Sequence, residues 1–269
     1  MDIKKAYYTK SKEEFDQYLN NLINSEDTIH FFLDSDNPFH YNRSAEACFN
    51  ILRVYRAIWE FDSLINSFNE FNKKQIIQSF LIDEIESTNK IENIESTRHN
   101  IYALINKLSD NDEYKIKSIV NSYSLLLNNK CSDISSLQDV RNIYDLLLDG
   151  SIDENNKPDG EYFRKEKVFI HDGIKHIHQG MYPEEKINSS MKELVHFYND
   201  SQFDIVERMI ISHFLIETIH PFYDGNGRLG RFMFSLGLYN ATKSLSSFVI
   251  SKAFSDNKSK YYHSFKNGR

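Results

Sequence analysis

Apolar side chains recur every three or four residues along most of the chain, a spacing typical of amphipathic helices. After a short amphipathic opening around residues 15–23, this spacing predicts helices at 44–70, 73–96, 99–108, 113–128, 135–148, 184–199 and 203–219. The last of these is apolar on nearly every face. We therefore expect that helix to be central and buried.

Glycine and proline are scarce, and their positions support the helical interpretation. The chain has nine glycines and four prolines, and the first glycine is Gly150. Residues 39–149 contain neither residue type. Glycine costs a helix interior about 1 kcal/mol and proline about 3 kcal/mol relative to alanine. A long stretch without either residue therefore favours helices.

One segment departs from helical spacing. A polar, turn-rich connector at residues 149–160 is followed by two short β-like runs, Val168–Ile170 and Ile174–His178. They flank Asp172-Gly173, and Asp-Gly between two such runs is typical of a hairpin turn. No other strand region is predicted, so the expected fold class is all-α with one β-hairpin.

Composition and charge exclude several functional classes. The 269 residues are 40% hydrophobic and 26% charged, as in ordinary globular proteins. The net charge of −7 provides no overall basic field for a nucleic-acid backbone. Two cysteines without metal-ligand spacing make neither a disulfide framework nor a zinc site. The opening lacks the apolar core of a signal peptide, and no run approaches the ~18 apolar residues of a membrane span. We expect a cytoplasmic protein without nucleic-acid or membrane partners.

Chemistry-bearing residues gather in the segment HPFYDGNGRLGR at residues 220–231, directly after the apolar helix. A glycine-rich turn that opens a helix leaves backbone N–H groups pointing outward at the positive end of the helix dipole. This arrangement suits phosphate. Arg228 and Arg231 lie on one side of the first turn and add two guanidinium groups.

Two further side chains in this segment complete a set for nucleotide chemistry. Asp224 is a hard oxygen ligand suited to Mg²⁺ that bridges phosphates. His220 ends the preceding helix and can act as a general base. A Gly-Asn-Gly turn or a single histidine is most often structural, but twelve residues here combine all of these groups. The segment matches neither a P-loop nor a dinucleotide-binding fingerprint.

The segment resembles the Fic motif, HPFxDGNGRxxR, at every defined position. Residues 160–164 (GEYFR), followed by 168–170, resemble the entry of the Fic flap, and Tyr182-Pro183 resembles its exit. Residues 260–262 (KYY) resemble the family's tyrosine pair near the adenine pocket. The resemblance covers about residues 80–269. It implies an all-helical core with a β-hairpin flap over the active site, and transfer of AMP from Mg-ATP to a protein hydroxyl.

The resemblance also implies residue roles. His220 would deprotonate the Ser, Thr or Tyr hydroxyl of a target protein or of the chain itself, and Asp224 would hold Mg²⁺. The nucleotide-binding positions would be Asp224, Gly225, Asn226, Gly227, Arg228, Leu229, Gly230, Arg231, Tyr261 and Tyr262. The flap, at about residues 165–180, would align the target by strand addition, with Ile170, Ile177 and His178 as docking positions.

A second motif lies far upstream, in STNKIEN at residues 87–93. Thr88 and Glu92 are four residues apart and share one helix face. Such pairs are common on solvated helices. Beside a Fic motif, however, Thr88, Glu92 and Asn93 resemble the family's inhibitory signature. The implied mechanism is that Glu92 pairs with Arg231 in place of the γ-phosphate, while Thr88 only positions the inhibitory helix.

The expected organisation is an N-terminal helical segment (1–75), an inhibitory helix (76–98) and a catalytic core (99–269). The expected function is that of a self-inhibited protein adenylyltransferase. Two alternatives remain open: removal of AMP by the same fold, with Glu92 orienting water, and a non-catalytic nucleotide-binding interaction module. A related branch transfers phosphate, but its motif usually departs at the glycine that is Gly227 here. The sequence leaves open the target and whether the chain forms a homo-oligomer.

Overall fold

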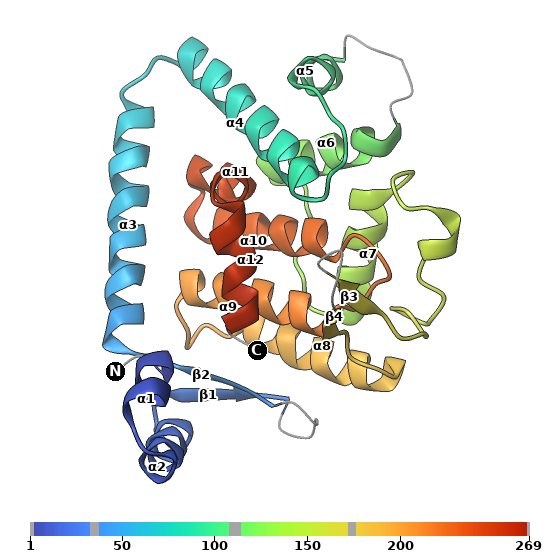
Figure 1. Cartoon of the computed structure of the whole chain (residues 1–269). Coiled ribbons are helices and arrows are strands. Elements are labelled where there is room, and N and C mark those ends of the chain that lie inside the picture. The colour runs from blue at the N-terminus through green and yellow to red at the C-terminus, as the bar shows by residue number, and fades with distance from the viewer. Residues whose placement is uncertain (1–2, 33–37, 108–113, 172–175, 268–269) are drawn as a thin grey trace. The chain divides into compact units, whose positions relative to one another are not determined.

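The computed structural model describes residues 3–32, 38–107, 114–171 and 176–267 (Figure 1). The chain divides into two compact units, Met1–Tyr55 and Arg56–Arg269. The first unit contains helices α1 (Ile3–Thr9) and α2 (Lys12–Ile23), strands β1 (Thr28–Phe31) and β2 (Phe39–Asn42), and the start of helix α3 (Ala45–Asn66).

Strands β1 and β2 form an antiparallel hairpin that the sequence analysis did not predict. Each strand has only four residues, and every β2 side chain is half-buried. A strand of this length without a clean apolar–polar alternation gives no periodic signal, so the expectation of a single strand region was wrong.

The second unit is helical and contains the Fic-like segment. After the end of α3, its helices are α4 (Glu70–Ile91), α5 (Arg98–Ile105), α6 (Tyr114–Leu127), α7 (Leu137–Leu148), α8 (Glu184–Asn199), α9 (Ile205–Ile219), α10 (Asn226–Thr242), α11 (Ile250–Asp256) and α12 (Lys258–Asn267). Two short 3₁₀ turns, η1 (Glu154–Asn156) and η2 (Leu245–Phe248), complete it. Among the described residues, no helix is both long and apolar enough to cross a membrane.

Helices α9 and α10 form the centre of this unit, and α8 packs against α9 (Figure 1). Met209, Leu215 and Ile219 of α9 are completely buried, which confirms the expectation of a central helix. Helix α10 packs closely on α9 at Gly237, because a Cβ there would overlap the sulfur of Met209. The loop between these two helices is the Fic-like segment, so its ends are held by the most buried part of the fold.

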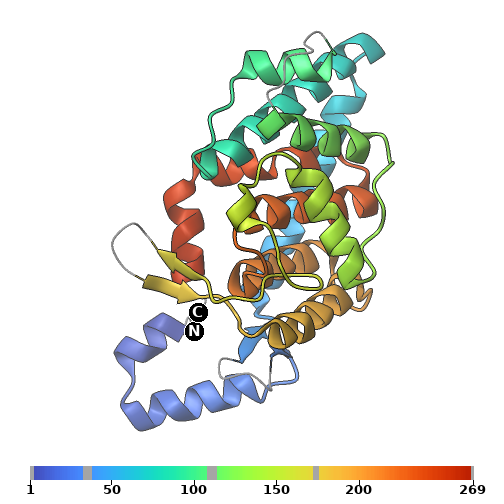
Figure 2. The ribbon, with the colours of Figure 1, turned by 90° about the vertical axis from the view of Figure 1, so that its right-hand side faces the viewer.

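The flap hairpin is present where it was predicted. Strands β3 (Phe169–His171) and β4 (His176–Gln179) pair antiparallel, with Ile170 opposite His178. Figure 2 shows this hairpin projecting from the helical body. The predicted turn at residues 172–173 lies outside the described residues, as do the side chains of Ile170, Ile177 and His178. The fold class, an all-α core with a β-hairpin flap, is confirmed.

Helix α4, which carries Thr88, is anchored by a buried carboxylate. It begins at Glu70 and ends at Ile91, whereas the sequence predicted a helix over residues 73–96. Glu84 is completely buried in this helix. Its carboxylate accepts hydrogen bonds from the backbone N–H (2.7 Å) and hydroxyl (2.6 Å) of Ser251 in α11, and from the Tyr123 hydroxyl (3.2 Å). These bonds tie α4 to α11 one helical turn before Thr88.

We predict that Glu84 makes stability depend on pH. Burial raises the pKa of Glu84 from 4.5 to about 7, although its hydrogen bonds oppose the rise. Because this pKa is higher in the folded chain than in the unfolded chain, the stability contribution is present at low pH and is lost as pH rises through about 7. Wild type should lose about 2–3 kcal/mol relative to Glu84→Gln between pH 5 and pH 8.

Urea unfolding at both pH values measures this difference. Glu86→Gln is a matched control, because Glu86 lies on the same helix with its side chain 35% exposed. A difference between wild type and Glu84→Gln that is the same at both pH values would contradict the prediction.

Candidate active site

The loop between α9 and α10 has left-handed backbone at both ends. His220 caps α9 with φ of 54°, and its N–H donates to the Ile216 carbonyl (2.8 Å). Gly225 caps α10 with φ of 83°. A Cβ at Gly225 would also overlap Leu148, so both the backbone angle and the available space require glycine here.

Hydrogen bonds and ring stacking hold the loop between these caps, both within the loop and to α7. The Asn226 side chain accepts from the Phe222 N–H (2.9 Å) and donates to the Phe222 carbonyl (2.8 Å). The Tyr144 hydroxyl donates to the Asp224 carbonyl (3.1 Å), and the Tyr144 ring stacks on Phe222. Asn226 is buried and its side chain holds the loop, which leaves the backbone N–H groups at the start of α10 available to a ligand.

Asp224 lies at the exposed edge of the loop. One carboxylate oxygen accepts from the Gly225 N–H (2.6 Å) and lies 3.7 Å from an Arg228 nitrogen. The side chain is 48% exposed, so the second oxygen can serve a hard cation such as Mg²⁺. The described residues contain no cluster of three His, Cys, Asp or Glu side chains that could hold a metal. A cation at Asp224 would therefore need further oxygens from its ligand and water.

Arg228 is a buried cation with an unused donor. Its Nη1 donates to the Ser151 hydroxyl (3.0 Å), which comes from the connector after α7. Its Nε is buried and has no hydrogen-bond partner among the described residues. Burial lowers the pKa of Arg228, while the carboxylates of Asp224 and Glu92 oppose that shift. A partly unsatisfied guanidinium at the N-terminus of a helix suits an anionic ligand.

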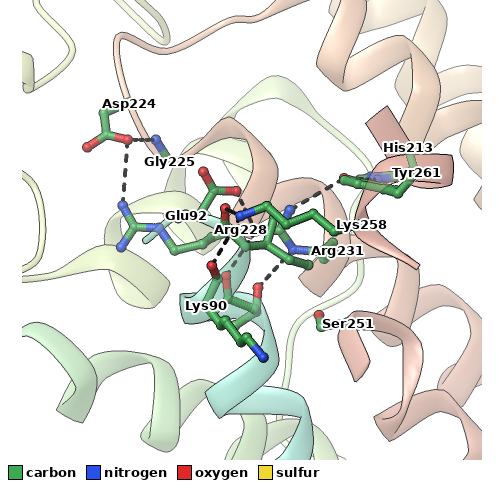
Figure 3. Close-up of polar contacts among 12 residues, drawn as sticks. Lys90, Glu92, His213, Asp224, Gly225, Arg228, Arg231, Ser251, Lys258 and Tyr261 are labelled. Atoms are coloured by element: carbon green, nitrogen blue, oxygen red, sulfur yellow. Dashed lines mark hydrogen bonds and ion pairs between the residues drawn. The ribbon is translucent and has the colours of Figure 1, made fainter. Parts of the chain in front are cut away.

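Arg231 is enclosed by the second motif (Figure 3). It is 1% exposed, and its Nη2 donates to a Glu92 carboxylate oxygen at 2.6 Å. Its Nε donates to the Thr88 hydroxyl (2.9 Å), and Nη2 also reaches the Thr88 carbonyl (3.3 Å). Burial lowers the pKa of Arg231, but Glu92, Tyr261 and Glu217 together outweigh this effect, and the net pKa is raised. Thr88 therefore contacts the arginine directly, and the expectation that it only positions the helix was wrong.

The Glu92 carboxylate also lies against the first turn of α10. A Cβ at Gly227 would overlap a Glu92 oxygen and lie 2.9 Å from Arg231 Nη1. A larger residue at this position would displace the Glu92 carboxylate from its present place. Glu92 thus lies at the helix N-terminus, where an anion is favoured by the helix dipole.

The backbone around Asn93 explains the last position of the second motif. Glu92 caps α4, and Asn93 follows with φ of 56°. The Asn93 N–H donates to the Lys90 carbonyl (3.3 Å) and the Ile94 N–H to the Asn89 carbonyl (2.9 Å). This is a Schellman ending, which favours Gly or Asn in the left-handed position. Asn93 therefore sets the end of the helix from which Glu92 projects.

The tyrosine pair contacts the same cluster. Tyr261 Oη accepts from Arg231 Nη1 (3.4 Å) and lies 3.0 Å from His213 Nε2. Burial and the Arg231 charge lower the pKa of His213 to about 3, so the imidazole is neutral, and its tautomer decides which partner donates in the bond to Tyr261. The Tyr262 hydroxyl donates to the Ile91 carbonyl at the end of α4 (3.3 Å).

The side-chain positions of two residues in the first turn of α10 face the core. The Leu229 side chain is completely buried, and a Cβ at Gly230 would lie 2.7 Å from His213 Nδ1. Both lie on the inward side of the first turn of α10, so their side-chain positions offer nothing to a ligand in the loop.

Sequence reasoning missed several supporting residues, namely Tyr144, Ser151, Arg164, Lys258 and the Glu84–Ser251 pair. Lys258 donates to the Ile91 carbonyl (3.0 Å) and so holds the end of α4 from α12. Arg164 lies in the GEYFR segment, whose likeness to the flap entry marked its position without indicating its contacts. Nothing in the local pattern around the other residues distinguishes them from ordinary helix and loop residues.

Comparison with known proteins places this geometry in a family. Residues 134–238 match the model of the Fic/DOC family. A protein of Aquifex aeolicus named probable protein adenylyltransferase aq_aa38 is 54% identical over 35 residues, which are 13% of this chain and 11% of that protein. Protein adenylyltransferase fic-1 of Caenorhabditis elegans is 36% identical over 55 residues, 19% of this chain and 11% of that protein. The matches thus span about a tenth of each relative.

Solved structures show the same fold. A Fic family protein from Desulfovibrio desulfuricans G20 superposes with a TM-score of 0.66 at 23% identity, covering 84% of this chain and 67% of that one. Fic-1 from C. elegans (residues 134–508) gives 0.54 at 15% identity, covering 99% and 82%. The family match, the relatives and the shared fold agree with the loop geometry, and residues 134–238 of this chain form a Fic/DOC family domain.

Proposed function

We propose that this chain is a protein adenylyltransferase that transfers AMP from Mg-ATP to a protein hydroxyl and is held inactive by its own Glu92. The observation that carries this proposal is the 2.6 Å contact between Glu92 and the buried Arg231, at the N-terminus of α10. Two relatives named adenylyltransferases, each matched over a short segment, support the choice of AMP as the transferred group.

The loop residues have separate roles in the reaction. The backbone at the start of α10 and the unused Nε of Arg228 bind the phosphates. His220 takes the proton from the target hydroxyl, whose oxygen then bonds to the α-phosphorus while pyrophosphate leaves. Arg231 neutralises the terminal phosphate when Glu92 is displaced.

Asp224 fits the metal that this chemistry uses. Its exposed carboxylate presents a hard oxygen beside the phosphate-binding turn, as a Mg²⁺ ligand must. When bound, Mg²⁺ spreads the negative charge of the phosphates and of the departing pyrophosphate.

Self-inhibition follows from charge and space at Arg231. The guanidinium is 1% exposed, and Thr88 and Glu92 already accept its hydrogen bonds. A γ-phosphate would have to share this buried cation with a carboxylate, and two anions at one site repel each other. ATP can therefore bind productively only when Glu92 leaves.

The position of Glu92 also favours a second candidate function, the hydrolytic removal of AMP from a modified protein. The Glu92 side chain is 31% exposed at the phosphate-binding turn, so its free oxygen can orient a water molecule. Under this alternative, Glu92→Gly loses hydrolysis of an AMP-modified protein. Under the main proposal the same variant gains transfer.

We predict that Glu92→Gly raises transfer. Freeing Arg231 should increase Mg²⁺-dependent incorporation of α-labelled ATP, including self-modification, by about 5–150-fold, the range of a ~1–3 kcal/mol coupling. Adding Arg231→Ala should remove the gain, because the two residues form one interacting pair. Glu95→Gly is the matched control, since Glu95 is an exposed carboxylate three residues further on.

Folded Glu92→Gly that incorporates no more label than wild type would leave the second motif without a regulatory role. A parallel reaction with γ-labelled ATP separates the transferred groups. Incorporation of that label would show phosphate transfer instead of AMP transfer.

We predict that Thr88→Ala also raises transfer, by a smaller factor. It removes the hydroxyl that accepts from Arg231 Nε but leaves Glu92 and the Thr88 carbonyl in place. The gain should be smaller than that of Glu92→Gly, because one hydrogen bond is lost while the charged competitor for Arg231 remains. Thr88→Ser keeps the hydroxyl and should behave like wild type in the same labelling assay. Activation by both variants would indicate that the methyl group, rather than the hydrogen bond, matters.

We predict that His220→Ala abolishes transfer without abolishing nucleotide binding. In the Glu92→Gly background the labelling rate should fall by about 10²–10⁴-fold, because the general base is lost. The Kd of Mg-ATP, measured by calorimetry, should change little, because the phosphate-binding turn and both arginines remain. His196→Ala on α8, where the histidine is exposed, is the control. Near-normal labelling by His220→Ala would contradict the assigned mechanism.

A further inference from the structure

Arg164 is a buried arginine whose three donor groups converge on the two ends of the flap and on the base. It is completely buried. Its Nε donates to the His220 carbonyl at 2.9 Å. Its Nη1 donates to the Glu166 carbonyl (2.5 Å), ahead of strand β3, and its Nη2 to the Met181 carbonyl (2.7 Å), after strand β4. One guanidinium therefore joins three segments of backbone.

Backbone hydrogen bonds join the same segments. The Arg164 N–H donates to the Pro221 carbonyl (3.2 Å), and the Met181 N–H donates to the Ile219 carbonyl (2.9 Å). The residues on both sides of His220 are thus bonded to the entry and to the exit of the flap. A Cβ at Gly180 would lie 2.5 Å from Arg164 Nη2 and 3.1 Å from the His220 Cβ, so the three residues meet with no spare room.

The contacts of Arg164 are costly for the fold to maintain. Burial lowers the pKa of this arginine, and its hydrogen bonds end on carbonyl oxygens rather than on a carboxylate. Burying a cation without an ion pair costs free energy of folding. Replacing Arg164 with an apolar residue, however, would leave three carbonyl oxygens without their hydrogen-bond donor. The arrangement therefore contributes geometry more than stability.

The contacts of Arg164 constrain the backbone of His220. A non-glycine residue in the left-handed region, here with φ of 54°, costs about 1–2 kcal/mol and persists only where its surroundings impose it. The Arg164 bond to the His220 carbonyl fixes the orientation of that peptide. The direction in which the imidazole leaves the backbone is fixed with it.

We propose that Arg164 is a positioning residue that holds the catalytic base and both ends of the flap as one rigid unit. The inference rests on the proposed function, in which the flap aligns the target segment and His220 takes the proton from its hydroxyl. Misplacing reacting groups by about 1 Å costs on the order of 10²-fold in rate. Arg164 thus couples target alignment to deprotonation without touching either substrate.

The first test is kinetic and uses the Glu92→Gly chain as the active parent. Arg164→Lys keeps the charge, and Arg164→Met removes it. Single-turnover self-modification with α-labelled Mg-ATP gives the limiting rate and the half-saturating ATP concentration. The limiting rate should fall about 10–100-fold in Arg164→Met and by a smaller factor in Arg164→Lys. The half-saturating concentration should stay within about twofold, because the phosphate-binding residues are not partners of Arg164.

Arg208→Lys is the matched control. Arg208 lies on α9 in the same unit and also donates to a backbone carbonyl, that of Tyr198 (2.8 Å). This hydrogen bond does not involve the flap, so Arg208→Lys should leave the limiting rate and the half-saturating ATP concentration unchanged. An equal loss of rate in this control, or a joint collapse of rate and ATP affinity in folded Arg164→Lys, would overturn the proposal in favour of a merely structural role.

The second test does not require activity. Amide hydrogen exchange at residues 180–181 and 219–220 should accelerate in both Arg164 variants and not in Arg208→Lys, while residues 229–242 of α10 stay protected. Unchanged exchange at residues 180–181 and 219–220 would overturn the proposal. So would faster exchange there with an undiminished limiting rate. If the Glu92→Gly parent transfers no AMP, the proposed function fails on that result, and the exchange data alone decide whether Arg164 holds the base and the flap together.

Discussion

A buried positive charge at Arg231 organises the site. A guanidinium that is 1% exposed must have its donors satisfied by nearby oxygens, because an unpaired buried cation is very costly. Glu92 and Thr88, on a helix about 140 residues earlier in the chain, supply those oxygens. The same cation is what a terminal phosphate would need. The need to satisfy the buried Arg231 thereby provides both a site for an anion and a carboxylate, that of Glu92, which competes for the site.

The loop that carries this site is rigid before any ligand arrives. Left-handed backbone at His220 and Gly225 sets its two ends, and the Asn226 side chain closes it through two hydrogen bonds to Phe222. Tyr144 holds the loop from outside through the Asp224 carbonyl. Binding groups fixed in advance lose little entropy when a ligand binds, so affinity and orientation come from the fold itself.

Release of Glu92 requires the end of α4 to move, and several contacts oppose that motion. Glu84 fastens the middle of the helix to α11, while Lys258 and Tyr262 hold its last carbonyl from α12. In the proposed mechanism, these contacts would set the free-energy gap between the inhibited and open arrangements. A partner or modification that weakened them would then raise transfer in proportion to the gap that it removed.

The sequence by itself determined most of the helices, the flap hairpin and the glycine-rich turn, because each depends on residues close together in the chain. It indicated the pairing of Glu92 with Arg231, 139 residues away, only through the resemblance to the inhibitory signature. Helical periodicity, the Asp-Gly turn and the twelve-residue motif are all local signals. The tertiary structure alone decided that Thr88 binds Arg231 directly, that the Asn226 side chain faces the loop, and that Leu229 faces the core. It also decided the roles of Arg164, Ser151 and Glu84. Their functions depend on burial and on partners dozens of residues away, and a buried arginine or glutamate looks in sequence like any solvated one.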